Sequence, residues 1–149
     1  INAYFHDALS DLDCARFAHT RGDHTGQQTW EALALLVALR LWAPLWKGRR
    51  VVITVRSDSV SALSAALNLS SQGTNTNALA REMALDIADS LYRPAVLAHI
   101  PGVCNVVADA LSRWHEPGRS NVLPAPLRGA SLQTPPSRVA AYYRAASPP

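Results

Sequence analysis

Residues 97–113 read LAHIPGVCNVVADALSR. The stretch continues an apolar run that extends from Ala95 to Ile100, which is the length of a buried strand. A Pro-Gly pair then turns the chain, and residues 106–114 have the apolar spacing of a helix. We therefore expect a strand, a turn and a helix, with His99 near the end of the strand and Asp109 within the helix.

Strand and helix patterns alternate upstream of this stretch. A Thr25-Gly26-Gln27-Gln28 sequence has the capping-box form that starts a helix. The order of segments predicts an α/β fold with parallel crossover connections. Strands are expected at 3–6, 51–55 and 95–100, helices at 27–42, 60–67, 79–91 and 106–114, and loops at 10–26 and 70–75.

Length and composition restrict the class of protein. The chain has 149 residues, of which 48% are hydrophobic and 17% charged, so it suits one folded domain with a tail and not a disordered chain. The longest apolar run, Ala32 to Leu39, is too short to span a membrane. Two cysteines, Cys14 and Cys104, make no disulfide framework and fit a reducing compartment. An intracellular protein of the cytoplasm or nucleus is expected.

Composition changes after Trp114. Seven of the ten prolines lie in residues 115–149, together with four arginines and a single acid. Proline blocks helix and removes strand hydrogen bonds. We expect a domain at 1–114 and a Pro/Arg-rich linker or tail at 115–149, irregular except for a helical turn near Val139 to Tyr143.

Three acids stand at positions suited to chemistry: Glu31, Asp58 and Asp109, the last of them within the helix expected at 106–114. Asp58 follows a hydrophobic strand, and ligands collect at the carboxyl ends of strands in α/β sheets. Glu31 lies early in an apolar helix, where an acid is costly unless it is paired or metal-bound. Taken singly, Asp58 could instead cap the next helix, and Glu31 could neutralise the N-terminus of its own helix.

A family resemblance links these acids. The stretch 97–113 resembles the end of ribonuclease H domains in retrotransposon reverse transcriptases, which close with His-x-Pro-Gly, then Asn, then Ala-Asp-x-Leu-Ser-Arg. Residues 29–34 (TWEALA) look like the helix that carries the family's catalytic Glu. Residues 51–58 look like the strand that ends in its second catalytic Asp, although Ser-Asp-Ser replaces the more typical Thr-Asp-Asn. The resemblance covers about residues 3–114.

The resemblance implies a two-metal-ion nuclease that cuts the RNA strand of an RNA–DNA hybrid. Glu31, Asp58 and Asp109 would be three of the family's four carboxylates that bind two Mg²⁺ ions, with Mn²⁺ as a possible substitute. His99 would serve proton transfer or product release, or would simply be a strand-end histidine bonded to the backbone. Asn105 would cap the last helix and so fix Asp109. A reverse-transcriptase domain of the same polyprotein is expected upstream.

The first carboxylate of the family has no counterpart in this sequence. The acids before Glu31, namely Asp7, Asp11, Asp13 and Asp23, all fall in or beside the expected loop. We therefore interpret 3–6 as the third strand of a ribonuclease H-like fold whose first two strands precede Ile1. The sheet would then have a gap between 3–6 and the strand that ends at Asp58.

Two other functions remain open at this point. The chain could be a degenerate ribonuclease H-like module that binds nucleic acid or acts as a scaffold without catalysis. A weaker alternative is another polynucleotide enzyme of the same superfold, such as an integrase or resolvase. The basic residues near the second strand (Lys47, Arg49, Arg50 and Arg56) could contact phosphates, or they could form an ordinary solvated edge, and a net charge of +3 does not decide between these.

The missing carboxylate gives a first prediction. Purified residues 1–149 should cut an RNA–DNA hybrid little or not at all in Mg²⁺, because an acid that bridges the two ions is absent. A gel assay with end-labelled RNA in the hybrid measures this. Robust cleavage that depends on Mg²⁺ would show that the chain supplies all the acids it needs.

Overall fold

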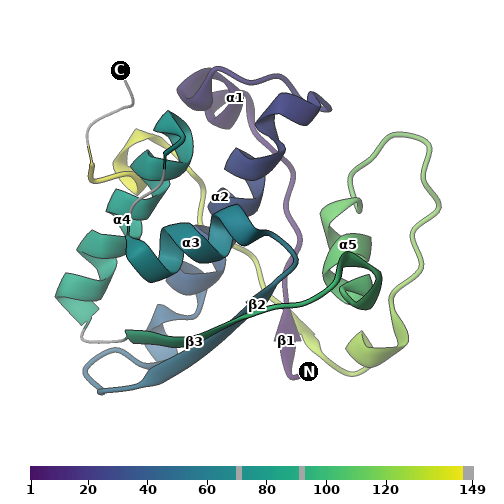
Figure 1. Ribbon diagram of the computed structural model, residues 1–149. Coiled ribbons are helices and arrows are strands. Elements are labelled where there is room, and N and C mark those ends of the chain that lie inside the picture. Colours follow the sequence, from purple (N-terminus) through teal and green to yellow (C-terminus); the bar gives the residue numbers. More distant parts are fainter. Residues whose placement is uncertain (70–71, 91–92, 146–149) are drawn as a thin grey trace.

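The computed structural model describes residues 1–69, 72–90 and 93–145, and its helices and strands alternate along the chain (Figure 1). The strands are β1 (Ala3–Tyr4), β2 (Val52–Ser57), β3 (Arg93–His99) and β4 (Ser131–Leu132). The α-helices are α1 (Asp11–Phe17), α2 (Gln27–Leu41), α3 (Val60–Asn68), α4 (Thr74–Ser90) and α5 (Val106–Ser112). Short 3₁₀ turns lie at His24–Gly26, Ala43–Leu45, Gly102–Cys104, Ala125–Leu127 and Ala140–Tyr142.

The strands form two separate parallel pairs. β2 pairs with β3, and β1 pairs with β4. The connection from β2 to β3 passes through α3 and α4, as a parallel crossover requires. The register of β2 and β3 shifts between Ile53 and Thr54, beside Pro94, which has no N–H to donate. Mixed helices and small parallel sheets make the protein α/β, as expected from the sequence.

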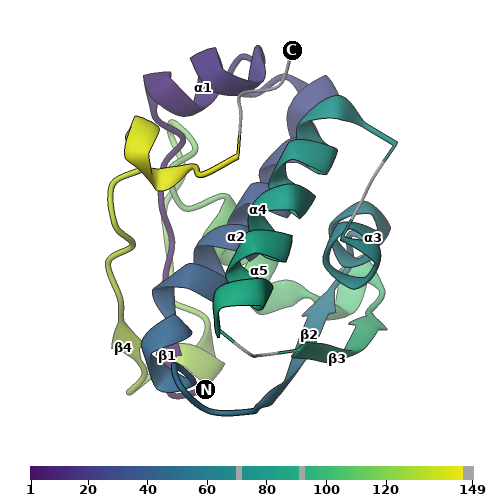
Figure 2. The ribbon, with the colours of Figure 1, turned by 90° about the vertical axis from the view of Figure 1, so that its left-hand side faces the viewer.

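Three helices enclose the main core. α2, α3 and α4 pack against one another, and α3 also lies against β2 and β3 (Figure 2). Each large apolar side chain that is fully buried stabilises the fold by roughly 1.5–3 kcal/mol. The buried cluster consists of Phe17, Ala32, Leu33, Leu36, Val37, Leu39, Ala62, Ala66, Leu79 and Met83. Among the described residues, no helix is both long and apolar enough to cross a membrane.

Most expected elements are present, with ends shifted by a few residues. The largest shift is in α4, which begins at Thr74, within the expected loop; positions 70 and 71 of that loop lie outside the described residues. The expected turn near Val139 to Tyr143 is confirmed as a 3₁₀ turn.

The expected loop at 10–26 is wrong in its first half, which contains α1. A capping box starts this helix, because Ser10 Oγ accepts from the Asp13 backbone N–H at 3.1 Å and Asp13 Oδ2 accepts from the Ser10 N–H at 2.8 Å. The capping box expected at Thr25 does not form. Gly26 precedes α2 without a side-chain cap, and Asp23 accepts from the Thr25 N–H instead.

The proline-rich segment after Trp114 is irregular, as expected, but it lies against the rest of the protein. β4 runs beside β1 (Figure 2), and Leu127 is buried. Further along, Glu82 of α4 accepts from the backbone N–H groups of Arg144 and Ala145 at 3.0 and 2.6 Å. The division into a domain and a linker stays a prediction, yet residues 121–145 are part of the folded structure.

A buried arginine anchors this segment. Arg138, with 6% of its side chain exposed, donates to both carboxylate oxygens of Asp13, which is fully buried, and also pairs with Asp7. Burial opposes ionisation of Asp13, but hydrogen bonds from Arg138 and from the Ser10 backbone hold its pKa below the ordinary value. A second cluster joins Arg40 of α2 and Arg144 to the α4 acids Glu82 and Asp86.

Loss of the Arg138 anchor should destabilise the whole fold. Arg138→Ala leaves the Asp13 carboxylate buried without its cation, which typically costs about 3–5 kcal/mol. Urea denaturation followed by circular dichroism measures the free energy of unfolding.

Arg119→Ala is the matched control, because Arg119 forms an exposed pair with Glu116 at 3.3 Å. Its loss should cost less than about 1 kcal/mol. Equal stabilities of the two variants would mean that the segment after Trp114 does not depend on Arg138.

Candidate functional site

Asp58 lies directly after β2, and the next residue, Ser59, caps α3. Ser59 is the N-cap residue of α3, and its Oγ accepts from the Ala62 N–H at 3.1 Å. The Ser59 N–H in turn donates to Ser57 Oγ at 3.0 Å. The alternative that Asp58 caps the helix is therefore wrong, and its exposed carboxylate is available to other groups.

The loop after β3 closes around Asp58. Asn105 Nδ2 donates to Asp58 Oδ1 at 2.9 Å, and His99 Nε2 lies 3.2 Å from the Asp58 carbonyl oxygen. A Cβ on Gly102 would sit 3.4 Å from Asp58 Oδ2, so the loop passes close to the carboxylate. Since a carbonyl only accepts, His99 carries its proton on Nε2 in this contact and leaves Nδ1 as the acceptor of the neutral ring.

The role expected for Asn105 needs correction. It precedes α5 as the N-cap residue, but its side chain makes no capping hydrogen bond. Its carbonyl accepts from the Asp109 N–H at 3.0 Å, as in any helix, while its amide reaches Asp58 on another element. The Asn105 side chain thus donates to Asp58 from its Nδ2 and does not cap α5.

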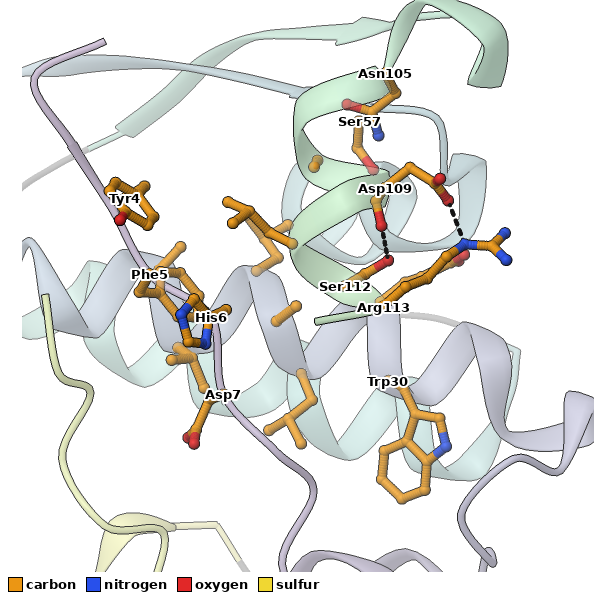
Figure 3. Close-up of a pocket in the computed structure, with 18 of the residues that line it drawn as sticks. Tyr4, Phe5, His6, Asp7, Trp30, Ser57, Asn105, Asp109, Ser112 and Arg113 are labelled. Carbon is orange, nitrogen blue, oxygen red and sulfur yellow. Dashed lines mark hydrogen bonds and ion pairs between the residues drawn. The ribbon is translucent and has the colours of Figure 1, made fainter. Parts of the chain in front are cut away.

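Asp109 lies in the first turn of α5 and is half exposed. Its Oδ1 accepts from Arg113 Nε at 2.9 Å, and its carbonyl accepts from Ser112 Oγ at 2.9 Å. Figure 3 shows both contacts, with the carboxylate turned toward Arg113.

Glu31 is the fifth residue of α2, and its Oε1 accepts from Gln27 Nε2 at 3.0 Å. The helix-dipole effect fades beyond the first turn, so the alternative that Glu31 serves only to neutralise the helix N-terminus loses its support.

A cavity of about 870 Å³ is lined by residues of β1 and of the end of β2, and several of the predicted residues lie in its walls. Its walls come from the β1 segment, α2, the end of β2 and α5 (Figure 3). Glu31 and Asp109 both line it, as do Ser57 and Asn105. Asp58 is not among the lining residues, although Asn105 connects it to this wall. Glu31 and Asp109 thus line the same cavity, whereas Asp58 and His99 are in contact with each other beside it.

The acids are of the ligand type that Mg²⁺ prefers, but the described structure does not bring the three of them together. Carboxylate oxygens are the ligands that Mg²⁺ prefers. Within residues 1–69, 72–90 and 93–145, no group of three or more His, Cys, Asp or Glu side chains could hold a metal ion. Each predicted acid instead accepts a hydrogen bond from a nearby nitrogen donor: Gln27, Asn105 or Arg113.

The four earlier aspartates have other partners. Asp7 and Asp13 pair with Arg138, Asp11 pairs with Arg21 at 2.7 Å, and Asp23 accepts from the Thr25 N–H at 2.9 Å. Asp7 and Asp23 nevertheless line the cavity, which their sequence positions did not indicate.

The basic residues near β2 lie at its two ends. Lys47, Arg49 and Arg50 precede its first residue, whereas Arg56 lies near its end and lines the cavity. Since a strand rises about 3.3 Å per residue, the two groups are separated by roughly the length of β2, about 20 Å.

A histidine pair joins the β1 segment to the end of α5. The His6 ring stacks on Trp114, with ring centroids 5.0 Å apart, and its Nδ1 lies 3.0 Å from His115 Nε2. Burial lowers the pKa of His6, and His115 lowers it further, while Asp7 acts in the opposite direction. Local sequence gave no signal for this pair, because its members are 109 positions apart.

Comparisons of the chain with profiles of protein families, with curated proteins and with solved structures found no match. The site is therefore interpreted from its own residues and from the resemblance of its motifs.

The His6 pair predicts a pH dependence of stability. The folded chain binds a proton at His6 less readily than the unfolded chain, because the pKa of His6 is lowered. This contribution to stability is therefore complete above the ordinary His pKa of about 6.5 and is lost as the pH falls below it through the lower pKa of folded His6. Thermal unfolding between neutral and mildly acidic pH measures it.

His6→Phe keeps an aromatic ring against Trp114 and should flatten this part of the pH profile. The control is His24→Phe, since the His24 side chain is 97% exposed. An unchanged slope in His6→Phe would assign the pH dependence to other groups.

Proposed function

We propose that the chain is a ribonuclease H-like domain of a retroelement reverse transcriptase, which in its parent protein cuts the RNA strand of RNA–DNA hybrids. One observation carries the proposal. The stretch 97–113, whose spacing resembles the family, contacts Asp58 through both His99 and Asn105. Asp58 and the loop after β3, two of the parts that the resemblance links, are thereby neighbours although they are distant in sequence.

The arrangement of the strands supports the finer fold assignment. A ribonuclease H-like sheet without its first two strands would leave the third strand apart from the strand that ends at Asp58. β1 and β2 belong to separate sheets, and the cavity lies between them.

In this proposal Glu31, Asp58 and Asp109 would hold Mg²⁺, or Mn²⁺ in its place. The ions would activate the attacking water and stabilise the leaving 3′ oxygen. His99, exposed at the end of β3 with Nδ1 as its acceptor nitrogen, would accept or release a proton near that site. An upstream reverse-transcriptase domain and an intracellular location, in the cytoplasm or nucleus, rest on the resemblance alone.

A second function is favoured by a different observation. All three acids have nitrogen donors as partners, and the described residues contain no group of three that could hold a metal ion. A degenerate module would keep the hybrid-binding surface and lose the need for metal. The two functions differ in how Mg²⁺ affects binding of a hybrid.

Hybrid binding measured with and without Mg²⁺ tests the proposal. Fluorescence anisotropy of a labelled RNA–DNA hybrid should show tighter binding in Mg²⁺ than in EDTA, because metal-free carboxylates repel phosphates. The double variant Asp58→Asn/Asp109→Asn should bind equally well in EDTA or better, and should lose the gain from Mg²⁺.

The matched control is Asp11→Asn/Asp89→Asn, which removes two exposed carboxylates that also pair with arginines and do not line the cavity. It should keep the response to Mg²⁺. Hybrid binding that is independent of Mg²⁺ would favour the degenerate module. A preference for duplex DNA over the hybrid, or no binding at all, would contradict the nuclease. No binding at all would leave only the scaffold role for the degenerate module.

A further inference from the structure

Arg113 lies one helical turn after Asp109, at the C-cap of α5, and both residues line the cavity. Its Nε donates to Asp109 Oδ1 at 2.9 Å, and the two side chains are 51% and 50% exposed. Exposed pairs at this spacing are weak and are screened by salt. The carboxylate can therefore be exchanged for another oxyanion at small cost.

The Arg113 guanidinium has hydrogen-bond donors that its contact with Asp109 does not use. Of its five N–H groups, the Nε–H is used by Asp109, and in the part of the chain that the structure describes no acceptor is found for the two terminal NH₂ groups. A planar fork of this kind matches the oxygens of a phosphate.

Other arginines are less suited to this role. Arg40 and Arg138 are mostly buried within ion clusters, and Arg144 pairs with two acids of α4. Arg21 and Arg119 are not among the residues that line the cavity. Arg56 is also exposed and lines the cavity, but among the described residues no acid pairs with it. Arg113 differs in that a weak contact joins it to Asp109, one of the predicted acids.

We propose that Arg113 is a phosphate-binding residue that exchanges the Asp109 carboxylate for a backbone phosphate of the bound RNA–DNA hybrid. This inference rests on the proposed function. Asp109 and the phosphate compete for one guanidinium, so the acid weakens metal-free binding both by repulsion and by occupying Arg113. A backbone contact of this kind would add affinity without reading sequence.

Hybrid binding in EDTA tests the exchange without any metal. Arg113→Gln should weaken binding on the order of fivefold and lower the slope of log Kd against log salt by about one. Arg113→Lys should keep that slope, because it keeps the charge. Asp109→Asn should tighten binding, and should do so less in the Arg113→Gln background, where only the repulsion is relieved.

The matched control is the pair Arg119 and Glu116, which is also exposed and close in sequence. Arg119→Gln should leave the affinity and the salt slope nearly unchanged, and circular dichroism establishes that each variant is folded. An unchanged salt slope in Arg113→Gln, or an equal effect of Asp109→Asn in both backgrounds, would overturn the exchange. If the unaltered chain fails to bind the hybrid, the proposed function itself falls.

Discussion

The parallel register of β2 and β3 sets Ser57 opposite His99, so both strands leave their sheet at the same edge. The residue after β2 is Asp58, and the residues after β3 form the loop that reaches Asn105. The contacts of Asp58 with His99 and Asn105 follow from this pairing. A shift of one residue would also turn the side chains of β2 to the opposite faces of the sheet, so the same register buries Val55 and fixes the site.

The net charge does not show which arginines form ion pairs within the fold and which are exposed at the surface. The chain has thirteen arginines and one lysine, with a net charge of only +3. Three arginines form ion pairs with acids and thereby hold the C-terminal segment against α1, α2 and α4: Arg40, Arg138 and Arg144. What remains at the cavity is a local mixture of acids and arginines. A nucleic-acid surface here would depend on that mixture, not on a uniformly basic face.

Periodicity in the sequence was sufficient to predict the helices α2 to α5, of which α2, α3 and α4 bury apolar side chains. It failed where a polar group decided the structure. α1 depends on a capping box between Ser10 and Asp13 within a segment rich in loop residues. The docking of the C-terminal segment depends on Arg138 meeting Asp13 across 125 positions. Proline content correctly indicated irregular backbone there, but irregular backbone can still pack, because an ion pair needs no regular element.

The candidate acids show the same limit at finer scale. The positions of the three acids, after β2 and on α2 and α5, could be predicted from the sequence. Only some of their hydrogen-bond partners could be predicted in the same way. Two of the three contacts, Gln27 with Glu31 and Arg113 with Asp109, join residues four apart on one helix and are visible in the spacing. The third, Asn105 with Asp58, joins two elements and replaced the expected cap. Exposed i,i+4 contacts contribute only about 0.2–0.5 kcal/mol each. Glu31 and Asp109 are therefore held loosely, while Asp58 is fixed by the loop that the β2–β3 register brings to it.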